Sequence, residues 1–504
     1  MTGISSWARF WARYGADRVA LIHEDGDRTW GQLEEHCARL AAGFLATGLR
    51  KGDRVGGLLR NGPDYIEVIL GCARIGAVFV PLNPLLTGRE LRVLAEDAGL
   101  SALVTDASFT SVLGPLDELI GAERIFFAGE PPAAGRSLRE LHQHGTVRDD
   151  RDVSGADPLL ICYTSGTTGR SKGAVLTHAN LEAVASGAIA FDALSRDDRA
   201  IITVPLAFTG ASVSVAIPFL RCGGALVIRH EFAPARVLDD IEQGVTFIGV
   251  VPLILERMAA EPDFAQRDLS GLRVAKVGGA PVPEHLLRLY AGRGVGLVNA
   301  YALTEGSGLN LQLQAHESLR RLGSVGIPLL GQEARVVNAD GGEADPGEPG
   351  ELLLAGTTVM KEYWRNPQAT GQALRDGWLH TGDVASMDAD GYFRIVDRAK
   401  DMIISGGINI YPAEIEAVLS RHPDVAEVAV VGVPDERWGE APVACVVTGN
   451  RELTLDQLNA FAEGSLARFK RPRELVLRQA PLPRSMSGKI LKREIRSELE
   501  KERP

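Results

Sequence analysis

Cysteine is scarce in the 504-residue chain, and its five cysteines are scattered. They are Cys37, Cys72, Cys162, Cys222 and Cys445. Disulfide frameworks and zinc sites both bring cysteines together at short, repeated spacings, and none of these five stands near another. The sequence therefore predicts neither a disulfide scaffold nor a zinc site, and it favours a cytoplasmic location, where thiols stay reduced.

Long apolar runs and an excess of positive charge are also missing. No stretch reaches about 18 apolar residues, so the sequence predicts no segment that spans a bilayer. The first residues, which include Trp7, Arg9, Phe10, Trp11 and Arg13, lack the apolar core of a signal peptide. Lysine and arginine number 54 against 65 acidic residues, a net charge of −11, which argues against nucleic acid as a partner.

The chain does have the length and the apolar content of a multidomain α/β enzyme. Its 504 residues exceed what one hydrophobic core supports, and 45% of them are apolar. Before residue 330, short β-branched runs such as Ile201–Val204 and Val274–Val277 alternate with helical periodicity. This alternation predicts parallel sheets covered by helices. Thr29, which precedes one helical pattern, is predicted to cap that helix.

The pattern changes after residue 330. Pairs of short strand-like runs around turn-rich residues, among them Val384–Met387 with Tyr392–Val396, predict hairpins. We therefore expect a barrel-like β subdomain at about residues 330–399, which completes an N-terminal domain of residues 1–399. Residues 400–504 carry strand and helix patterns of their own, and they predict a small, mobile α+β domain that acts as a lid.

One loop carries the strongest signal of phosphate chemistry. Residues 161–173 begin in an apolar run typical of a buried strand and then combine glycines, hydroxyl side chains and a lysine. Glycines let backbone N–H groups turn toward an anion, while the hydroxyls and the lysine add donors and charge. The residues concerned are Thr164, Ser165, Gly166, Thr167, Thr168, Gly169, Lys172 and Gly173. The spacing differs from the familiar P-loop, and a flexible surface turn is the alternative.

Five further segments follow in order along the chain. They are Gly278–Pro281, Tyr301–Glu305, Thr381–Asp383, Asp397–Gly407 and Pro483–Lys489. Together with the loop, these segments make the chain resemble the adenylate-forming superfamily, which contains acyl-CoA synthetases, amino-acid adenylation domains and luciferases. The resemblance extends from Thr29 to Lys489. It implies a reaction in two halves, in which a carboxylate attacks the α-phosphate of ATP and a thiol then displaces AMP.

The resemblance assigns a nucleotide site residue by residue. Besides the loop, the residues implied to bind ATP and AMP are Gly279, Ala280, Pro281, Tyr301, Thr304, Asp383, Arg398 and Lys489. Tyr301 would stack on adenine, Asp383 would accept the ribose hydroxyls, and Glu305 would hold Mg²⁺. Thr304, Glu305 and Lys489 form the implied catalytic set, in which the Lys489 charge stabilises the adenylation transition state. Taken alone, such residues are also compatible with a helix cap, a turn, a core aromatic and a solvated lysine.

The C-terminal domain is implied to present a second surface, which receives the thiol. Lys400 stands where the family hinges between its two arrangements. Glycines would leave room for the narrow pantetheine chain of coenzyme A, while aromatic rings and guanidinium groups would meet its nucleotide. The implied residues are Ser405, Gly406 and Gly407 for the tunnel, and Trp438, Phe469, Arg471 and Arg473 for the nucleotide.

The implied acyl pocket indicates the class of acid. Its residues are Phe208, Ala211, Ser212, Gly249, Val250, Gly278 and Gly306, with Gly308 beside them. The glycines predict space, and the pocket has no arginine or lysine for a second carboxylate unless Lys276 turns inward. We therefore expect a monocarboxylic acid with a medium or long acyl chain, or an arylalkanoate. Thr209 replaces the aspartate that an amino-acid adenylation domain would offer, which disfavours an amino acid.

These features predict an acyl-CoA ligase of fatty acid metabolism that uses ATP, Mg²⁺ and coenzyme A and releases AMP and pyrophosphate. An acyl-AMP ligase that loads a carrier-protein thiol is the alternative. A nucleotide-binding regulatory protein without chemistry is the hypothesis from another class. The sequence leaves the identity of the acid, the pathway and a homodimeric state open.

Overall fold

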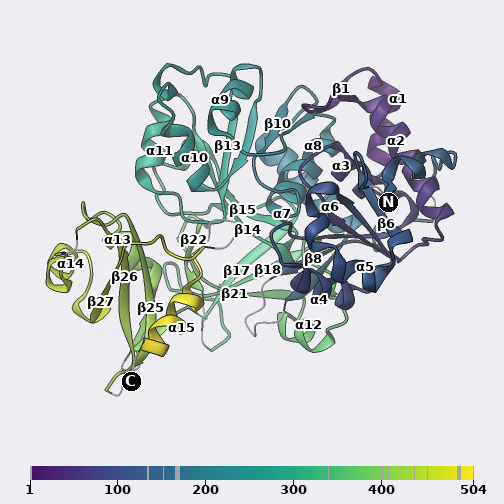
Figure 1. The fold of residues 1–504 in the computed structure, drawn as a ribbon. Coiled ribbons are helices and arrows are strands. Elements are labelled where there is room, and N and C mark those ends of the chain that lie inside the picture. The colour runs from purple at the N-terminus through teal and green to yellow at the C-terminus, as the bar shows by residue number, and fades with distance from the viewer. Residues whose placement is uncertain are drawn as a thin grey trace. The chain divides into compact units, whose positions relative to one another are not determined.

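The computed structural model describes most of the chain (Figure 1). The described residues are 3–132, 135–150, 152–164, 171–338, 340–398, 401–405, 408–435, 437–450, 452–484 and 490–502. The chain divides into two compact units, Met1–Ala334 with Leu354–His380 and Arg335–Leu353 with Thr381–Pro504. The predicted α/β class, with a large N-terminal part and a small C-terminal part, is confirmed. The domain boundary predicted at residues 399 and 400 lies outside the described residues and stays a prediction.

A nine-stranded sheet is the larger sheet of the first unit, in the order β16-β15-β14-β13-β12-β10-β11-β1-β2. Its strands are β1 (Val19–Ile22), β2 (Arg28–Thr29), β10 (Arg199–Ile202), β11 (Ala225–Ile228), β12 (Phe247–Val250), β13 (Val274–Gly278), β14 (Leu297–Leu303), β15 (Gly308–Leu313) and β16 (Ile327–Pro328). Neighbours from β14 to β1 pair in parallel, whereas β15, β16 and β2 are antiparallel additions at the two edges. The parallel strands expected from Ile201–Val204 and Val274–Val277 are therefore present.

An eight-stranded sheet lies in the same unit, in the order β19-β9-β8-β4-β3-β5-β6-β7. Its strands are β3 (Arg54–Leu58), β4 (Val78–Pro81), β5 (Ala102–Asp106), β6 (Ile125–Ala128), β7 (Arg136–Ser137), β8 (Pro158–Thr164), β9 (Lys172–Thr177) and β19 (Glu362–Tyr363). β8 and β9 are antiparallel partners, so the predicted phosphate loop joins the two strands of a hairpin. β19 adds to the free side of β9 and places Tyr363 opposite Ala174.

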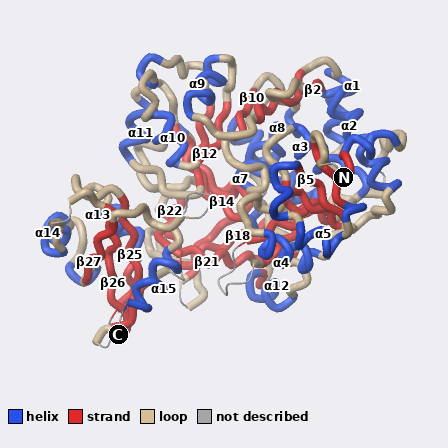
Figure 2. Tube along the Cα trace, in the orientation of Figure 1, coloured by secondary structure: helices blue, strands red, loops and turns tan. Residues whose placement is uncertain are grey.

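Helices flank the strands of both sheets (Figure 2). They are α1 (Ser6–Gly15), α2 (Trp30–Ala46), α3 (Pro63–Ile75), α4 (Gly88–Ala98), α5 (Gly114–Ile120), α6 (His178–Asp192), α7 (Thr209–Ala211), the π-helical turn η4 (Ser212–Ala216), α8 (Ile217–Cys222), α9 (Pro234–Glu242), α10 (Pro252–Ala259), α11 (Glu284–Ala291) and α12 (Pro367–Ala373). Thr29 caps α2 as predicted, since its side chain accepts from the backbone N–H of Gln32, whose side chain accepts from Thr29 N–H in return.

The core of the first unit lies between these helices and the sheets. α9, α10 and α11 lie beside β13 (Figure 1) and β12 (Figure 2), and their apolar faces bury residues such as Leu238, Leu255 and Leu286 against Ile248 and Val277. Each buried side chain of this size stabilises the fold by about 1.5–3 kcal/mol relative to exposure. This packing holds the strand ends that carry the candidate site.

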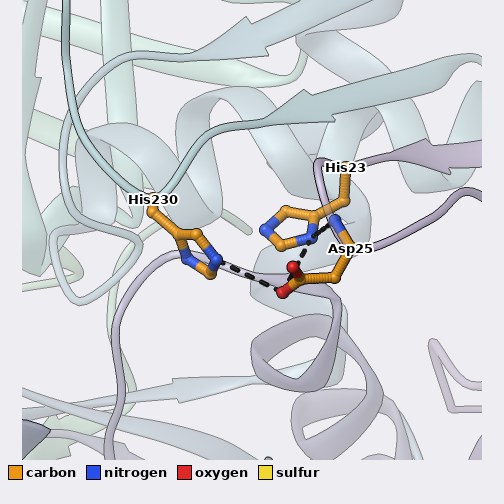
Figure 3. A group of neighbouring side chains, drawn as sticks. All are labelled: His23, Asp25 and His230. Carbon is orange, nitrogen blue, oxygen red and sulfur yellow. Dashed lines mark hydrogen bonds and ion pairs between the residues drawn. The ribbon is translucent and has the colours of Figure 1, made fainter.

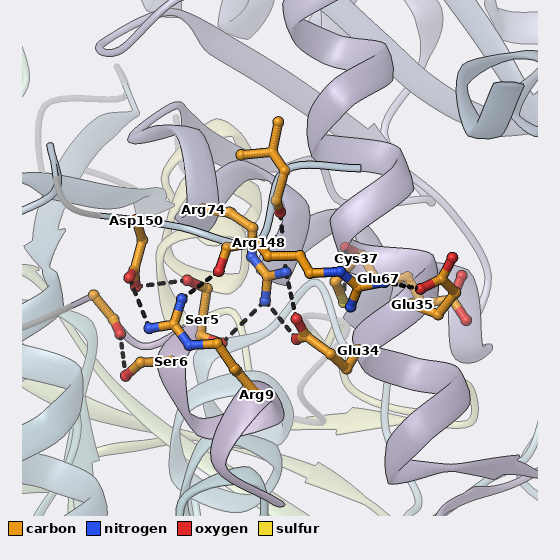
Figure 4. A network of polar contacts seen from close by, with 12 residues as sticks. Ser5, Ser6, Arg9, Glu34, Glu35, Cys37, Glu67, Arg74, Arg148 and Asp150 are labelled. Atoms are coloured by element: carbon orange, nitrogen blue, oxygen red, sulfur yellow. Dashed lines mark hydrogen bonds and ion pairs between the residues drawn. The ribbon is translucent and has the colours of Figure 1, made fainter. Parts of the chain in front are cut away.

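A buried polar network ties the N-terminal segment to the rest of the first unit (Figure 4). The Arg74 guanidinium of α3 donates to both carboxylate oxygens of Glu34 on α2, at 2.8 and 2.6 Å, and to the Ser5 carbonyl at 3.2 Å. The Ser5 hydroxyl donates to Asp150 at 2.9 Å, and Arg9 pairs with the same carboxylate at 3.1 Å. Such a network is costly to break, because removing one partner leaves the other charge buried without compensation.

A curled five-stranded sheet forms where the sequence predicts a barrel-like subdomain. Its order is β17-β18-β21-β20, with β22 also paired to β21. The strands are β17 (Gln332–Val337), β18 (Gly350–Gly356), β20 (Leu374–Arg375), β21 (Trp378–Met387) and β22 (Phe393–Arg398). The predicted hairpin of Val384–Met387 and Tyr392–Val396 is confirmed, since β21 and β22 pair in antiparallel register.

The C-terminal part of the second unit has a sheet of its own, in the order β24-β23-β26-β25, with β27 on β26. The elements are β23 (Ile403–Ser405), β24 (Ile408–Ile410), α13 (Pro412–Leu419), β25 (Glu427–Asp435), β26 (Gly439–Val447), α14 (Leu455–Phe461), β27 (Glu474–Arg478) and α15 (Lys492–Glu502). Alternate residues of β25 face opposite sides, so Val430 packs with Ile415 of α13 while Val431 packs with Ile495 of α15. This is the α+β architecture predicted for the C-terminal domain. Among the described helices, none is long and apolar enough to cross a membrane.

Candidate functional site

The predicted phosphate loop lies between two strand ends that the structure describes. β8 ends at Thr164 and β9 begins at Lys172, and the Thr164 hydroxyl donates to the Lys172 carbonyl at 3.4 Å. The loop residues Ser165, Gly166, Thr167, Thr168 and Gly169 lie outside the described residues. Their contacts with phosphate stay predictions.

Glu305 contacts Thr164, the last residue of β8, from the other sheet of the same unit. It belongs to a short 3-10 turn, η6 (Thr304–Gly306), that directly follows β14. Its Oε1 accepts hydrogen bonds from the Thr164 hydroxyl at 3.3 Å and from the Tyr363 hydroxyl at 2.8 Å. Its backbone carbonyl accepts from Met360 N–H at 2.8 Å. Thr164 thus contacts both the Lys172 backbone and the Glu305 carboxylate, and the roles predicted for these residues stay predictions.

Among the described residues, none forms an ion pair with the Glu305 carboxylate. In the same part of the chain, its Oε2 has no hydrogen-bond partner. Burial and, after it, the Glu305 charge raise the pKa of Tyr363, so its hydroxyl stays a donor at any physiological pH. Burial, with a smaller contribution from Glu305, also raises the pKa of Cys162 to about 12. A half-buried carboxylate with one open oxygen suits a hard divalent cation such as Mg²⁺.

Tyr363 contacts two predicted site residues and was not itself predicted from the sequence. Its hydroxyl reaches Glu305, and the Lys172 ammonium lies 5.1 Å from the centroid of its ring. The contact depends on the pairing of β19 with β9, which joins residues far apart in the chain. No local pattern around Tyr363 signals this pairing.

The residues of the implied acyl pocket gather at the neighbouring strand ends. Thr304 and Thr209 share a hydrogen bond between their hydroxyl oxygens at 3.3 Å, which joins η6 to α7. Ser212 donates to the Phe208 carbonyl at 3.0 Å, and Ala211 and Ser212 are both buried. The π-helical turn η4 follows directly; such turns often mark functional sites.

The glycines of this pocket do not provide the space that the sequence suggested. A Cβ atom at Gly249 would lie 2.6 Å from the Val215 side chain, and one at Gly306 would lie 2.2 Å from Asn310 Nδ2. A Cβ atom at Gly308 would lie 2.7 Å from Ser214 Oγ. These glycines allow close packing against η4 and β15. The prediction that they leave open volume in the pocket was therefore wrong. Gly278 is similar, with its Cβ position 3.0 Å from the Ala300 carbonyl oxygen.

Lys276 does not turn toward the implied acyl pocket to meet a second carboxylate. Its ammonium pairs with Asp192 at 2.5 Å, and it lies 5.4 Å from the centroid of the Phe247 ring. Both members of the ion pair are buried, and Gln312 donates to the other Asp192 oxygen. The one lysine that could have bound a dicarboxylic acid is therefore already paired.

The implied adenine and ribose residues have distinct environments. Gly279, Ala280 and Pro281 are exposed directly after β13, and Gly279 has a φ of +80°, which favours glycine. Tyr301 is buried on the adjacent strand β14. In the second unit, Asp383 is buried on β21 opposite Arg398 of β22. The ligand contacts of these residues stay predictions.

The residues implied for coenzyme A are partly gathered in the second unit. The Arg473 and Arg437 guanidinium carbons lie 4.2 and 4.9 Å from the Trp438 ring centroid. Arg471 instead donates to the Leu466 carbonyl at 3.1 Å and lies 3.5 Å from a Glu463 oxygen. Phe469 is 41% exposed, which leaves its ring accessible, and Ser405 pairs with Gly439. Lys400, Gly406, Gly407 and Lys489 lie outside the described residues.

A cluster with metal-ligand chemistry consists of His23, Asp25 and His230 (Figure 3). His230 suits a metal, since its Nδ1 lies 3.0 Å from the Asn61 carbonyl and its Nε2 lies 3.3 Å from Asp25 Oδ2. His23 does not, because its Nδ1 accepts the Asp25 backbone N–H at 3.1 Å. In the neutral ring the proton then sits on the buried Nε2, so neither nitrogen offers a free lone pair. The cluster as it stands does not form a three-ligand metal site.

Comparison with known proteins shows to which family the chain belongs. Residues 7–364 match the family of AMP-binding enzymes, and residues 414–489 match the AMP-binding enzyme C-terminal domain. A feruloyl-CoA synthase of an Amycolatopsis species is 40% identical over 500 residues, which cover 98% of each chain. An indoleacetate–CoA ligase of Aromatoleum aromaticum is 38% identical over 98% of this chain and 97% of its own.

Solved structures agree with this assignment. The o-succinylbenzoate coenzyme A synthetase of Bacillus subtilis, in complex with ATP and magnesium ion, superimposes with a TM-score of 0.87 at 30% identity. The match covers 97% of this chain and 98% of that chain. The fold and the matching family models define a member of the adenylate-forming superfamily, and the chain belongs to the family of AMP-binding enzymes. Within that family it is an AMP-forming ligase.

Proposed function

We propose that this protein is an acyl-CoA ligase that activates a monocarboxylic acid with ATP. In the first half-reaction a carboxylate oxygen attacks the α-phosphorus, the bond to pyrophosphate breaks, and an acyl-adenylate forms. In the second, the coenzyme A sulfur attacks the acyl carbon, loses its proton, and AMP leaves. The observation that carries the proposal is the Glu305 carboxylate, whose Oε1 accepts from Thr164 and Tyr363 and whose Oε2 has no partner among the described residues.

The residues present fit a magnesium ion. Mg²⁺ is usually held by one or two carboxylates together with substrate phosphates, and Glu305 Oε2 has no partner within the described part of the chain. The ion would supply charge neutralisation at the triphosphate, which is the main electrostatic need of the first half-reaction. Lys172, which makes no ion pair among the described residues, would add a mobile positive charge.

The acid is proposed to carry a single carboxylate and an apolar acyl group. Lys276 is paired with Asp192, so it is not available for a second carboxylate. Phe208 and the buried Val213, Val215 and Ala216 of η4 supply apolar side chains nearby, beside the two serines of the same turn. Relatives named for ferulate and indoleacetate support an arylalkanoate or a related aryl acid over acetate or malonate.

Coenzyme A is proposed as the acceptor, with the C-terminal domain as the part that receives it. The cluster of Trp438 with Arg473 and Arg437 offers stacking surface and positive charge, as the nucleotide of coenzyme A requires. We further propose that residues 400–504 move about Lys400 and present Lys489 for adenylation and the Ser405–Gly407 face for thioester formation.

A screen of pyrophosphate release over a panel of acids, with and without coenzyme A, tests the proposal. We expect release with octanoate or an arylalkanoate, and an acyl-CoA product only when coenzyme A is present. Acetate as the best substrate would contradict the acyl-pocket assignment. Pyrophosphate release without any coenzyme A thioester, in the absence of carrier protein, would favour the carrier-protein alternative.

A further inference from the structure

Tyr363 joins the separate parts of the candidate nucleotide site. It lies on β19, is 8% exposed, and pairs with Ala174 of β9. Its hydroxyl donates to Glu305 Oε1 at 2.8 Å, and its ring centroid lies 5.1 Å from the Lys172 ammonium. One buried side chain therefore contacts both charged groups that are expected to meet the triphosphate and its metal.

The Tyr363 hydroxyl gives the two carboxylate oxygens of Glu305 different hydrogen-bond environments. Oε1 accepts from Tyr363 and, at the longer distance of 3.3 Å, from Thr164. Oε2 has no hydrogen-bond partner among the residues that the structure describes. Donors on one oxygen fix the orientation of a carboxylate and leave the lone pairs of the other oxygen for a cation.

The ring of Tyr363 also contacts the ammonium group of Lys172. An ammonium group is attracted to the face of an aromatic ring, and this attraction grows where water is excluded. In the described part of the chain, Lys172 makes no ion pair with a carboxylate. Its charge is thus placed at the side chain whose hydroxyl donates to Glu305, with no ion pair between the two charges among the described residues.

We propose that Tyr363 is a positioning residue for adenylation, whose hydroxyl orients Glu305 for Mg²⁺ and whose ring orients Lys172 for the nucleotide phosphates. This inference rests on the proposed function, because both roles presuppose an ATP site. Groups that orient a metal ligand typically change metal affinity by about 10–100-fold when they are removed. Tyr363 acts through Glu305 and Lys172, so its removal should leave the affinity for the acid unchanged.

Two substitutions separate the hydroxyl from the ring. Tyr363→Phe removes only the hydrogen bond to Glu305, whereas Tyr363→Leu also removes the aromatic face beneath Lys172. The readout is Mn²⁺ binding to the protein with a non-hydrolysable ATP analogue, followed by electron paramagnetic resonance, so no turnover is needed. We expect Tyr363→Phe to weaken Mn²⁺ binding about 10-fold and to preserve analogue affinity at saturating Mn²⁺. Tyr363→Leu is expected to weaken analogue binding as well.

Tyr163→Phe is the matched control. Tyr163 lies on β8, and its hydroxyl donates to Asp97 at 2.6 Å, away from Glu305. This variant should bind Mn²⁺ like the unmodified protein, and thermal unfolding should show that all three variants fold.

Two results would overturn the inference. One is equal Mn²⁺ affinity in Tyr363→Phe and the unmodified protein, and the other is an equal loss in Tyr163→Phe, which would indicate general packing. The proposed function fails on a different observation, namely an unmodified protein that binds Mn²⁺ and the analogue but releases no pyrophosphate with any acid.

Discussion

Two charged side chains of the first unit, Lys276 and Glu305, have opposite environments. Lys276 is buried and neutralised by Asp192 at 2.5 Å, whereas Glu305 makes no ion pair among the described residues. Burying a charge is costly unless a partner compensates it. Lys276 is therefore structural, while Glu305 keeps a charge that a cation can use.

The ion pair of Lys276 leads to a stability prediction. Lys276→Met should destabilise the protein by about 3–5 kcal/mol, because the Asp192 carboxylate stays buried without its cation. Adding Asp192→Asn in the same chain should recover part of this loss, and the preference for monocarboxylic acids should not change. Urea unfolding of both variants measures the effect. A Lys276→Met variant that is as stable as the unmodified protein would contradict the structural role of Lys276.

At the scale of the single element, helix α3 contains an acid whose ionised form is disfavoured by its surroundings. Asp64 lies in its first turn, where burial, and after it the charge of Glu67, raise the pKa of Asp64 from 3.8 to about 6. The folded protein then binds a proton that the unfolded chain has already released between pH 4 and 6. Stability is therefore lost as the pH rises through this range, by at most about 3 kcal/mol.

The variant Asp64→Asn should remove this loss. Relative to the unmodified protein it should gain stability between pH 4 and pH 7, because its side chain has no proton to release. Asp117→Asn, which changes an exposed acid in the first turn of α5, controls for the loss of a favourable charge at a helix start. If the unfolding free energies of Asp64→Asn and the unmodified protein differ by the same amount at pH 4 and at pH 7, the raised pKa of Asp64 is disproved.

Features that depend on residues close together in the chain could be predicted from the sequence, whereas contacts between distant elements could not. The cap of Thr29 on α2 depends on a residue three positions away, and the hydroxyl- and glycine-rich segment at 161–173 is visible in one stretch of chain. The contact between Tyr363 and Glu305 requires β19 to pair with β9. The misread glycines illustrate the same limit, since Val215 fills the space beside Gly249 from a different element.

At the scale of the whole molecule, the sequence predicted the class of fold and the order of its parts. Parallel sheets, the curled sheet and the α+β C-terminal part are all present. The proposed alternation of two C-terminal surfaces concerns residues such as Lys400 and Lys489, which lie outside the described residues. Both surfaces would serve one chemistry, the transfer of AMP from ATP to a carboxylate.

Isotope transfer tests that chemistry most directly. The protein is incubated with Mg²⁺, ATP, coenzyme A and an accepted acid whose carboxylate oxygens are both ¹⁸O, and the nucleotide product is analysed by mass spectrometry. Attack of the carboxylate on the α-phosphorus predicts AMP that carries one ¹⁸O atom. Unlabelled AMP, or ADP with the label in phosphate, would contradict the account.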